Sequence, residues 1–297
     1  MRVVVSGSSG LIGRSVVAAL ASRGDEITAL VRRPAAAGEA QWDPMAGSID
    51  TGALDGADGV VHLAGAGIGD KRWSASRRRE IVSSRVEATT LLAESLAGLH
   101  RPPAVLVSAS AVGFYGDRGD EVLTEESTGG TGFLAEVCRG WEDATTPARD
   151  AGIRVIRLRS GVVLSAQGGA LARQLPLFRS GVGGRLGSGR QWLSWITLGD
   201  EVRAILHALD QPAVRGAVNA TAPEPVTNRG FTRALGRTLH RPSFLAVPGF
   251  ALRVALGPDL ASEMVLAGQR VLPAQLTSTG FTFEQPRIES ALAAVLS

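Results

Sequence analysis

The sequence contains little sulfur and few aromatic rings. Its 297 residues include one cysteine, three methionines and 5% aromatic residues. The single cysteine, Cys138, cannot form an internal disulfide. The four histidines lie far apart and show no metal-ligand spacing, so we expect no bound metal: His62, His100, His207 and His240.

Long apolar runs are also absent. No run approaches the roughly 18 residues of a membrane helix, and the chain enters a strand-like segment directly after its first residues, with no signal-peptide pattern. We therefore expect a cytoplasmic protein without a membrane partner.

Lysine and tyrosine occur once each, as Lys71 and Tyr115, while arginine is frequent and scattered. The formal net charge is only +3, and the one tight basic cluster, Arg77 to Arg79, opens a predicted helix of mixed polarity. A nucleic-acid partner needs a concentrated basic face. We interpret this cluster as a solvated helix face and expect no nucleic-acid partner.

A glycine-rich turn follows the apolar run at residues 3–5. Strand, tight turn and helix in this order allow backbone N–H groups to approach a diphosphate at the positive helix end. The alternative is a βα turn that binds nothing. The predicted contact residues are Gly7, Ser9, Gly10, Leu11, Ile12 and Gly13.

Strand-like and helical segments alternate along the first half of the chain, which predicts an α/β fold with a doubly wound parallel sheet, the Rossmann arrangement. We expect strands at 3–6, 26–31, 59–63, 104–108, 153–158 and 217–220, and helices at 11–22, 75–99, 133–150 and 200–209, the last capped by Asp200. Residues 1–160, completed by about 196–222, would form the dinucleotide-binding domain. Residues 161–195 and 223–297 would form a smaller C-terminal substrate lobe, with residues 181–189 as an ordered loop over the site.

The end of the second predicted strand indicates the cofactor. An acidic residue there would favour NAD(H), whereas an arginine can hold a 2′-phosphate. This chain has Arg32 and Arg33 and no acidic residue at that point. The sequence therefore favours NADP(H) over NAD(H), unless both arginines simply face solvent.

Several segments together carry a family resemblance. The glycine turn, residues 60–65 and residues 107–116 resemble an extended short-chain dehydrogenase/reductase of the NAD(P)-dependent epimerase/dehydratase group. More narrowly, the chain resembles a sugar-nucleotide epimerase-like subgroup with its own C-terminal segment, through residues 72–73, 83–85, 132–142, 183–192 and 268–273. The resemblance implies further cofactor contacts at Leu63, Ala64, Gly65 and Ser108.

The resemblance also implies a catalytic pair that this chain lacks. The superfamily uses a tyrosine acid/base with a lysine four residues later. Alignment on Trp141 and Glu142 places Leu134 at the tyrosine position and Cys138 at the lysine position. The usual proton donor is therefore missing.

Three residues are candidates to replace it. Ser110, or Ser108 beside it, follows a strand at the edge where substrates bind and could orient a carbonyl, or could only cap the loop. Tyr115 could act as an acid, or could pack on the loop. Glu136 is a weaker candidate, and Cys138 has the character of a small core residue.

The substrate side of the site is predicted from two segments. Lys71, Arg72 and Trp73 could present cations and an aromatic ring to an anionic substrate. Gln191 and Trp192 could form a pocket wall, or could fill the seam between the lobes.

These observations predict an NADP(H)-binding oxidoreductase or epimerase-like protein, a monomer or homodimer. Its small substrate is unknown, and phosphorylated or nucleotide-linked compounds are the expected class. The alternative is a non-catalytic NADPH-binding sensor or interaction module. A hydrolase is disfavoured because the chain has no Gly-x-Ser-x-Gly elbow. A P-loop is excluded because its lysine has no counterpart.

Overall fold

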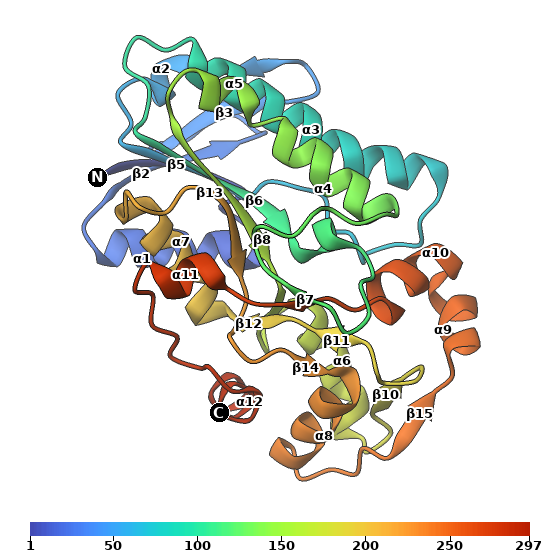
Figure 1. The fold of residues 1–297 in the computed structure, drawn as a ribbon. Coiled ribbons are helices and arrows are strands. Elements are labelled where there is room, and N and C mark those ends of the chain that lie inside the picture. The colour runs from blue at the N-terminus through green and yellow to red at the C-terminus, as the bar shows by residue number, and fades with distance from the viewer.

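An eight-stranded sheet forms the centre of the protein, as described by a computed structural model of residues 1–297 (Figure 1). All its strands run parallel except β4, which pairs antiparallel with β3. In spatial order the strands are β13 (Gly216–Ala220), β8 (Arg154–Ser160), β6 (Val105–Ala111), β5 (Gly59–His62), β1 (Arg2–Ser6), β2 (Glu26–Val31), β3 (Glu39–Asp43) and β4 (Ser48–Ile49).

Alternate residues of β1 enter two different cores, because successive side chains of a strand point to opposite faces. Val3 and Val5 belong to one buried cluster, and Val4 belongs to the other. A sheet that is apolar on both faces must be covered by helices on both. The predicted doubly wound α/β fold is therefore confirmed.

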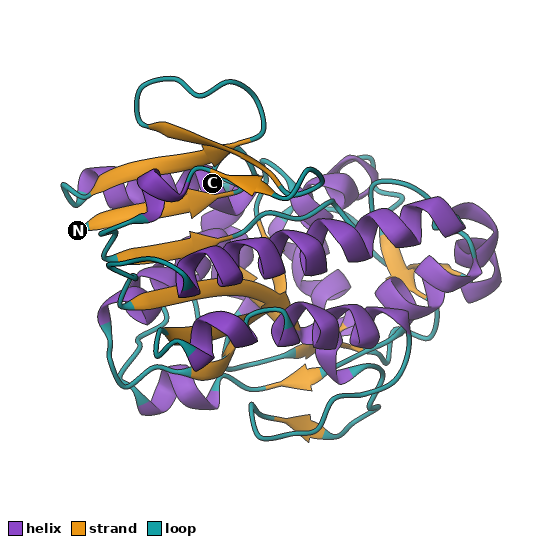
Figure 2. Cartoon of the chain, turned by 90° about the horizontal axis from the view of Figure 1, so that it is seen from above, coloured by secondary structure: helices purple, strands orange, loops and turns teal.

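The helices divide between the two faces of the sheet, and in Figure 2 the long α3 lies in front of the sheet, roughly along the direction of its strands. The Val4 core is closed by α2 (Thr51–Leu54), α3 (Ala75–Ala97) and α5 (Thr146–Asp150), with α4 (Phe133–Asp143) packed beside α3. The Val3 core is closed by α1 (Leu11–Ser22), α7 (Leu198–Asp210) and α11 (Ala274–Ser278).

Three details of the main sheet and its helices differ from the sequence-based expectation. The helix expected at 133–150 is two helices, α4 and α5, because Pro147 cannot continue a helix interior. The hairpin of β3 and β4 was not expected. The N-cap of α7 is Thr197, whose hydroxyl accepts from the N–H of Asp200 at 3.1 Å, so Asp200 lies in the first turn and is not the cap.

The remaining elements are short and surround the carboxyl ends of the sheet strands. The short strands pair as β9 (Val162–Leu164) with β12 (Trp195–Thr197), β10 (Gly184–Leu186) with β15 (Leu245–Val247), β11 (Trp192–Leu193) with β14 (Val226–Thr227), and β7 (Val122–Leu123) with β16 (Arg270–Val271). The helices are α6 (Gly169–Arg179), α8 (Asn228–Thr238), α9 (Gly249–Leu256), α10 (Pro258–Leu260) and α12 (Ile288–Leu296), with a 3-10 turn η1 (Val112–Tyr115) and a π-helical turn η2 (Ala261–Leu266). Residues 184–186, expected within a loop, form a strand.

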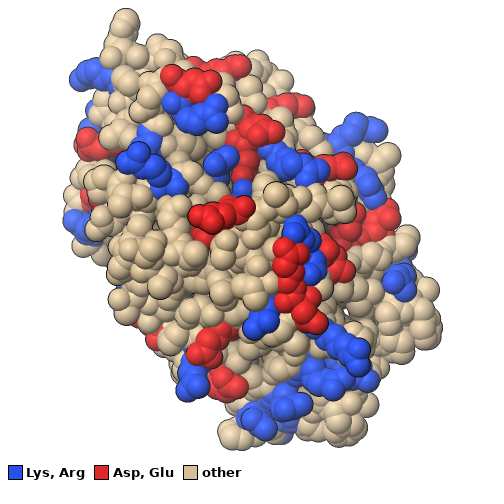
Figure 3. Space-filling model, in the orientation of Figure 1, with Lys and Arg blue, Asp and Glu red and all other residues tan.

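Basic and acidic side chains alternate over much of the face in Figure 3, whereas blue side chains gather at its lower end, over α8. Three arginines line a groove there, Arg185, Arg229 and Arg233, beside the exposed ring of Phe244. None of the helices combines the length and the apolar character needed to cross a membrane.

Candidate functional site

The glycine turn between β1 and α1 depends on two close backbone approaches. Gly7 has a φ of +70°, and a Cβ on it would lie 2.7 Å from the carbonyl carbon of Leu63 at the end of β5. A Cβ on Gly13 would overlap the carbonyl oxygen of Gly7. Gly10 begins α1 without a side-chain cap. The turn can therefore present the first N–H groups of α1 to an anion, which fits a dinucleotide diphosphate.

The other residues of the turn have ordinary packing roles. Arg14 donates to the carbonyl of Ser9 at 2.8 Å, and Ile12 packs against the core. Leu11 lies under Gly168, where an added Cβ would meet its side chain at 3.3 Å. The segment before α6 thus covers the start of α1.

The end of β2 presents two unequal arginines. Arg33 donates to both carboxylate oxygens of Glu39, at 2.6 and 2.7 Å. This contact lowers the pKa of Glu39. Arg32 is exposed and takes part in no ion pair. Of the two arginines expected to hold a 2′-phosphate, Arg32 is thus the one with a free guanidinium. The sequence showed no acidic residue at this strand end, but the structure brings Glu39 close to it.

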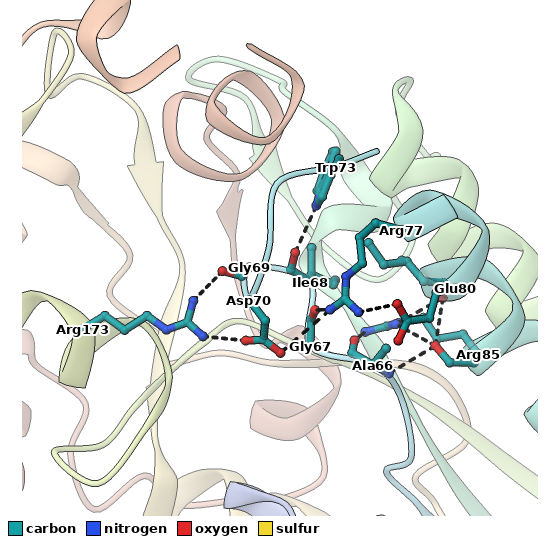
Figure 4. Close-up of polar contacts among 12 residues, drawn as sticks. Ala66, Gly67, Ile68, Gly69, Asp70, Trp73, Arg77, Glu80, Arg85 and Arg173 are labelled. Carbon is teal, nitrogen blue, oxygen red and sulfur yellow. Dashed lines mark hydrogen bonds and ion pairs between the residues drawn. The ribbon is translucent and has the colours of Figure 1, made fainter. Parts of the chain in front are cut away.

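A loop at residues 66–73 follows Leu63, Ala64 and Gly65, and each carbonyl in its first part is held by a side chain (Figure 4). The donors are Arg85 Nη2 to Ala66 O at 2.9 Å, Arg77 Nη2 to Gly67 O, Trp73 Nε1 to Ile68 O at 3.0 Å, and Arg173 Nη1 to Gly69 O at 2.5 Å. Arg77 and Arg85 come from α3 and Arg173 from α6. The loop therefore connects the main sheet to the smaller elements.

Ser110, at the end of β6, belongs to a buried polar network. Its hydroxyl donates to Glu142 Oε1 at 2.7 Å. Arg159 donates to both oxygens of Glu142, at 2.7 and 2.8 Å. Because Ser110 donates its proton to Glu142, its lone pairs are what it can offer to a substrate hydroxyl. Sequence reasoning missed Glu142 and Arg159 as members of this site.

Tyr115 lies in the same network and not in an open loop. It is fully buried, and its hydroxyl contacts Asn219 Oδ1 at 2.7 Å, Thr124 O at 3.0 Å and Arg159 Nη1 at 2.9 Å. Burial raises the pKa of this phenol. A phenol with these partners is held in place and has no direct route to a substrate.

Ser108 and Cys138 are both buried, with different surroundings. Ser108 is 1% exposed, and its buried hydroxyl has no hydrogen-bond partner. In the register of the sheet Ser108 lies beside His62. His62 is satisfied by Ser6 at 2.6 Å and Thr89 at 2.9 Å, and burial lowers its pKa to about 4. Burial raises the pKa of the Cys138 thiol to about 12, so the neutral thiol packs in the interior.

Two of the three residues of the 66–73 loop expected on the substrate side have intramolecular partners. Arg72 donates to the carbonyls of Val254 and Ala255, at the C-terminal end of α9. Trp73 packs edge-on against Phe133 with ring centroids 5.1 Å apart, while Lys71 is exposed. These contacts join the 66–73 loop to α9 and α4.

Gln191 and Trp192 contact other short elements. Gln191 donates to the carbonyls of Leu186 at 3.0 Å and Val265 at 3.1 Å. Trp192 donates to Asp120 at 2.7 Å. This arrangement resembles the seam alternative more than a pocket wall.

The parallel sheet with its glycine turn at the carboxyl edge defines a Rossmann-fold protein. Residues 3–220 match the model of the NAD dependent epimerase/dehydratase family, and residues 247–295 match a domain of unknown function, DUF1731. The chain belongs to the NAD dependent epimerase/dehydratase family, which confirms the resemblance noted in the sequence.

Relatives span the whole chain. An epimerase family protein of Mycobacterium tuberculosis is 46% identical, covering 98% of this chain and 96% of its own length. The human epimerase family protein SDR39U1 is 35% identical over the full length of both. A crystal structure of that human protein, isoform 2, with NADPH has a TM-score of 0.92, 34% identity and 99% coverage of both chains.

A second structure is described as a nucleoside-diphosphate sugar epimerase from Corynebacterium glutamicum. Its TM-score is 0.82 and its identity 41%, and the match covers 100% of this chain but 58% of that chain. These likenesses agree with the predicted fold class.

Proposed function

We propose that this protein binds NADP(H) and carries out a hydride-transfer reaction, as an oxidoreductase or epimerase, on a small phosphorylated or nucleotide-linked substrate. The observation that carries the proposal is the turn at Gly7 to Gly13. Its glycines bring the backbone against β5, and α1 begins there without a side-chain cap. A relative of 34% identity has been crystallised with NADPH, which supports the same cofactor here.

The residues at the carboxyl edge of the sheet would have separate roles in binding the cofactor and orienting the substrate. The turn would hold the diphosphate, and Arg32 the 2′-phosphate, as one guanidinium suits one phosphate. When bound, the nicotinamide supplies or accepts the hydride. Ser110, fixed by Glu142, would accept a hydrogen bond from a substrate hydroxyl and orient it. Water would carry the proton, since Leu134 and Cys138 occupy the positions of the missing pair.

Dinucleotide binding is tested with Gly13→Ala, because the new methyl group would overlap the Gly7 carbonyl oxygen. We expect Gly13→Ala to lose both NADPH and NADH in calorimetry. The control is Gly199→Ala on α7, where a Cβ meets nothing within 4 Å. Wild-type protein that binds neither nucleotide at millimolar concentration would refute the proposal.

Turnover is tested separately, with a substrate panel followed by NADPH absorbance. Activity that disappears in Ser110→Ala and persists in Ser22→Ala, a control at the far end of α1, supports an enzyme. The second candidate, an NADPH-binding sensor or interaction module, is favoured by the buried Tyr115 and by the thiol at position 138. Tight binding without turnover on any substrate would support the sensor.

A cytoplasmic location and a monomeric or homodimeric state remain predictions from the sequence. Sedimentation of the purified protein tests the oligomeric state.

A further inference from the structure

Arg85 carries a buried positive charge that no carboxylate neutralises. The residue lies on α3 and is 6% exposed. Its guanidinium donates to the carbonyls of Ala66 at 2.9 Å and Ile81 at 3.2 Å, and lies 3.5 Å from the hydroxyl of Ser84. The buried Nε has no hydrogen-bond partner. A buried charge of this kind is costly unless an opposite charge is close.

A second buried arginine on α3, Arg77, provides a comparison. Arg77 is 7% exposed, so it does not belong to the solvated helix face expected for residues 77–79, and it donates to the carbonyl of Gly67 in the 66–73 loop. Its Nε, like that of Arg85, is buried without a hydrogen-bond partner. Arg77 is paired, however, with Glu80 at 2.6 Å. Figure 4 shows both guanidinium groups directed at the loop. An arginine can therefore hold the loop while its charge is paired with a carboxylate. Arg85 also holds the loop, but its charge is unpaired.

The unpaired charge lies beside the proposed cofactor site. A Cβ on Gly65 would lie 3.3 Å from the guanidinium carbon of Arg85, and Gly65 follows Leu63 by two residues. Leu63 in turn packs against Gly7 of the glycine turn. The turn, the end of β5 and the buried guanidinium of Arg85 therefore lie next to one another in that order.

Arg85 also adjoins the position of the missing lysine. Its charge acts on the buried Cys138 thiol and partly opposes the rise that burial causes in the pKa of that thiol. Its guanidinium carbon lies 4.9 Å from the ring centroid of Trp141 on the same helix as Cys138. The cation absent from α4 is therefore present next to α4, on α3.

We propose that Arg85 is a cofactor-binding residue whose guanidinium pairs with the diphosphate of the bound dinucleotide. The inference rests on the proposed function, because it requires NADP(H) to bind at the turn. The negative charge of the cofactor would then complete an ion pair that this chain leaves open. NADPH and NADH carry the same diphosphate, so Arg85 acts on both equally, unlike Arg32.

The test uses Arg85→Gln and Arg85→Lys, with Arg77→Gln as the matched control on the same helix face and loop. Affinities for NADPH and NADH are measured by calorimetry without substrate. We expect Arg85→Gln to weaken the affinity for NADPH and the affinity for NADH by the same factor. The factor should be about tenfold or more, as for the loss of a hydrogen bond to a charged group. Arg85→Lys should recover part of this, and Arg77→Gln should stay within about threefold of wild type.

Thermal unfolding without nucleotide separates binding from loop support. Because its charge is unpaired, Arg85→Gln should leave the Tm unchanged or raise it, while the Tm gain on adding NADPH shrinks. Unchanged affinity for both nucleotides in Arg85→Gln would overturn the inference and leave the proposed function intact. An equal loss in Arg77→Gln would also overturn it, by showing that the loop alone matters.

A crystal structure of the wild-type protein with NADPH decides the matter even where Arg85→Gln fails to fold. The inference requires an Arg85 nitrogen within hydrogen-bond distance of a diphosphate oxygen. A guanidinium that still contacts only Ala66, Ile81 and Ser84 would overturn it. Wild-type protein that binds neither nucleotide would instead refute the proposed function, and this inference with it.

Discussion

The carboxylate of Glu263 caps α4 from 129 residues further along the chain, with Oε2 accepting from the N–H of Leu134 at 2.8 Å. Its Oε1 accepts from the N–H of Phe133 at 3.2 Å. The N-cap position of this helix is Gly132, which has no side chain to cap it. The C-terminal segment therefore supplies an N-cap to the helix that carries positions 134 and 138.

Replacing Glu263 by alanine should loosen the start of α4. Loss of an N-cap costs about 1 kcal/mol of unfolding free energy, and the lost negative charge at the helix N-terminus adds to this. Urea unfolding measures the total, and amide exchange at Phe133 and Leu134 locates it. Glu126→Ala, at an exposed glutamate without partners, is the control. Exchange rates at Phe133 and Leu134 that match wild type would contradict the capping role.

The two arginines after β2 should differ in their effect on cofactor choice. Arg32→Ala removes a free guanidinium, so we expect NADPH to bind about tenfold or more weakly while NADH is little affected. Arg33→Ala should have a smaller effect, because Glu39 holds that guanidinium at 2.6 and 2.7 Å. Parallel titrations with both nucleotides measure the ratio. An equal loss for NADPH and NADH in Arg32→Ala would show that this strand end does not contact the 2′-phosphate.

Local sequence patterns predicted most of the helices and strands of the main sheet. The range of α1 and that of β2 agree with the sequence, because apolar spacing and glycine punctuation are properties of neighbouring residues. The strand β3 escaped notice because its five residues alternate Ala40 and Trp42 with polar ones over a very short span. Without β3 there was no reason to pair Arg33 with Glu39.

The site depends on long-range contacts that no local pattern encodes. Ser110 and Glu142 are 32 residues apart in the chain, and Tyr115 and Asn219 are 104 apart. Charged helix residues usually face solvent, so nothing in the sequence singled out Arg85 as buried. Tyr115 drew attention because it is unique, but its burial follows from tertiary packing.

Tyr115→Phe separates a structural phenol from a proton donor. The hydroxyl bonds to Asn219 and Arg159, at 2.7 and 2.9 Å, and removing it leaves their buried groups short of a partner. We expect a loss of about 1–3 kcal/mol of unfolding free energy, with no change in the pH profile of any turnover. Denaturant unfolding and steady-state rates give the two readouts. Unaltered stability together with abolished turnover would identify Tyr115 as the acid.

Glu201 makes the stability of the folded protein depend on pH, and a single substitution can isolate this dependence. The residue is fully buried on α7, and only one of its carboxylate oxygens has a partner, Ser160 Oγ at 2.5 Å. Burial raises its pKa from 4.5 to about 7. Between pH 4.5 and about 7, the folded protein therefore retains on Glu201 a proton that the unfolded chain releases. The stability that Glu201 contributes is fully present below pH 4.5 and is lost as the pH rises to about 7.

Glu201→Gln should remove this dependence, because the amide is neutral at every pH and its oxygen can still accept from Ser160. At about pH 8 the variant should be more stable than wild type by up to ~3 kcal/mol, since each pKa unit corresponds to about 1.4 kcal/mol. The difference should shrink as the pH falls to 4.5 and below, because Glu201 then becomes protonated in the unfolded chain as well. Urea unfolding of both proteins across this range measures it. A stability difference that does not change with pH would show that Glu201 is ionised in the folded protein, with a partner that compensates its burial.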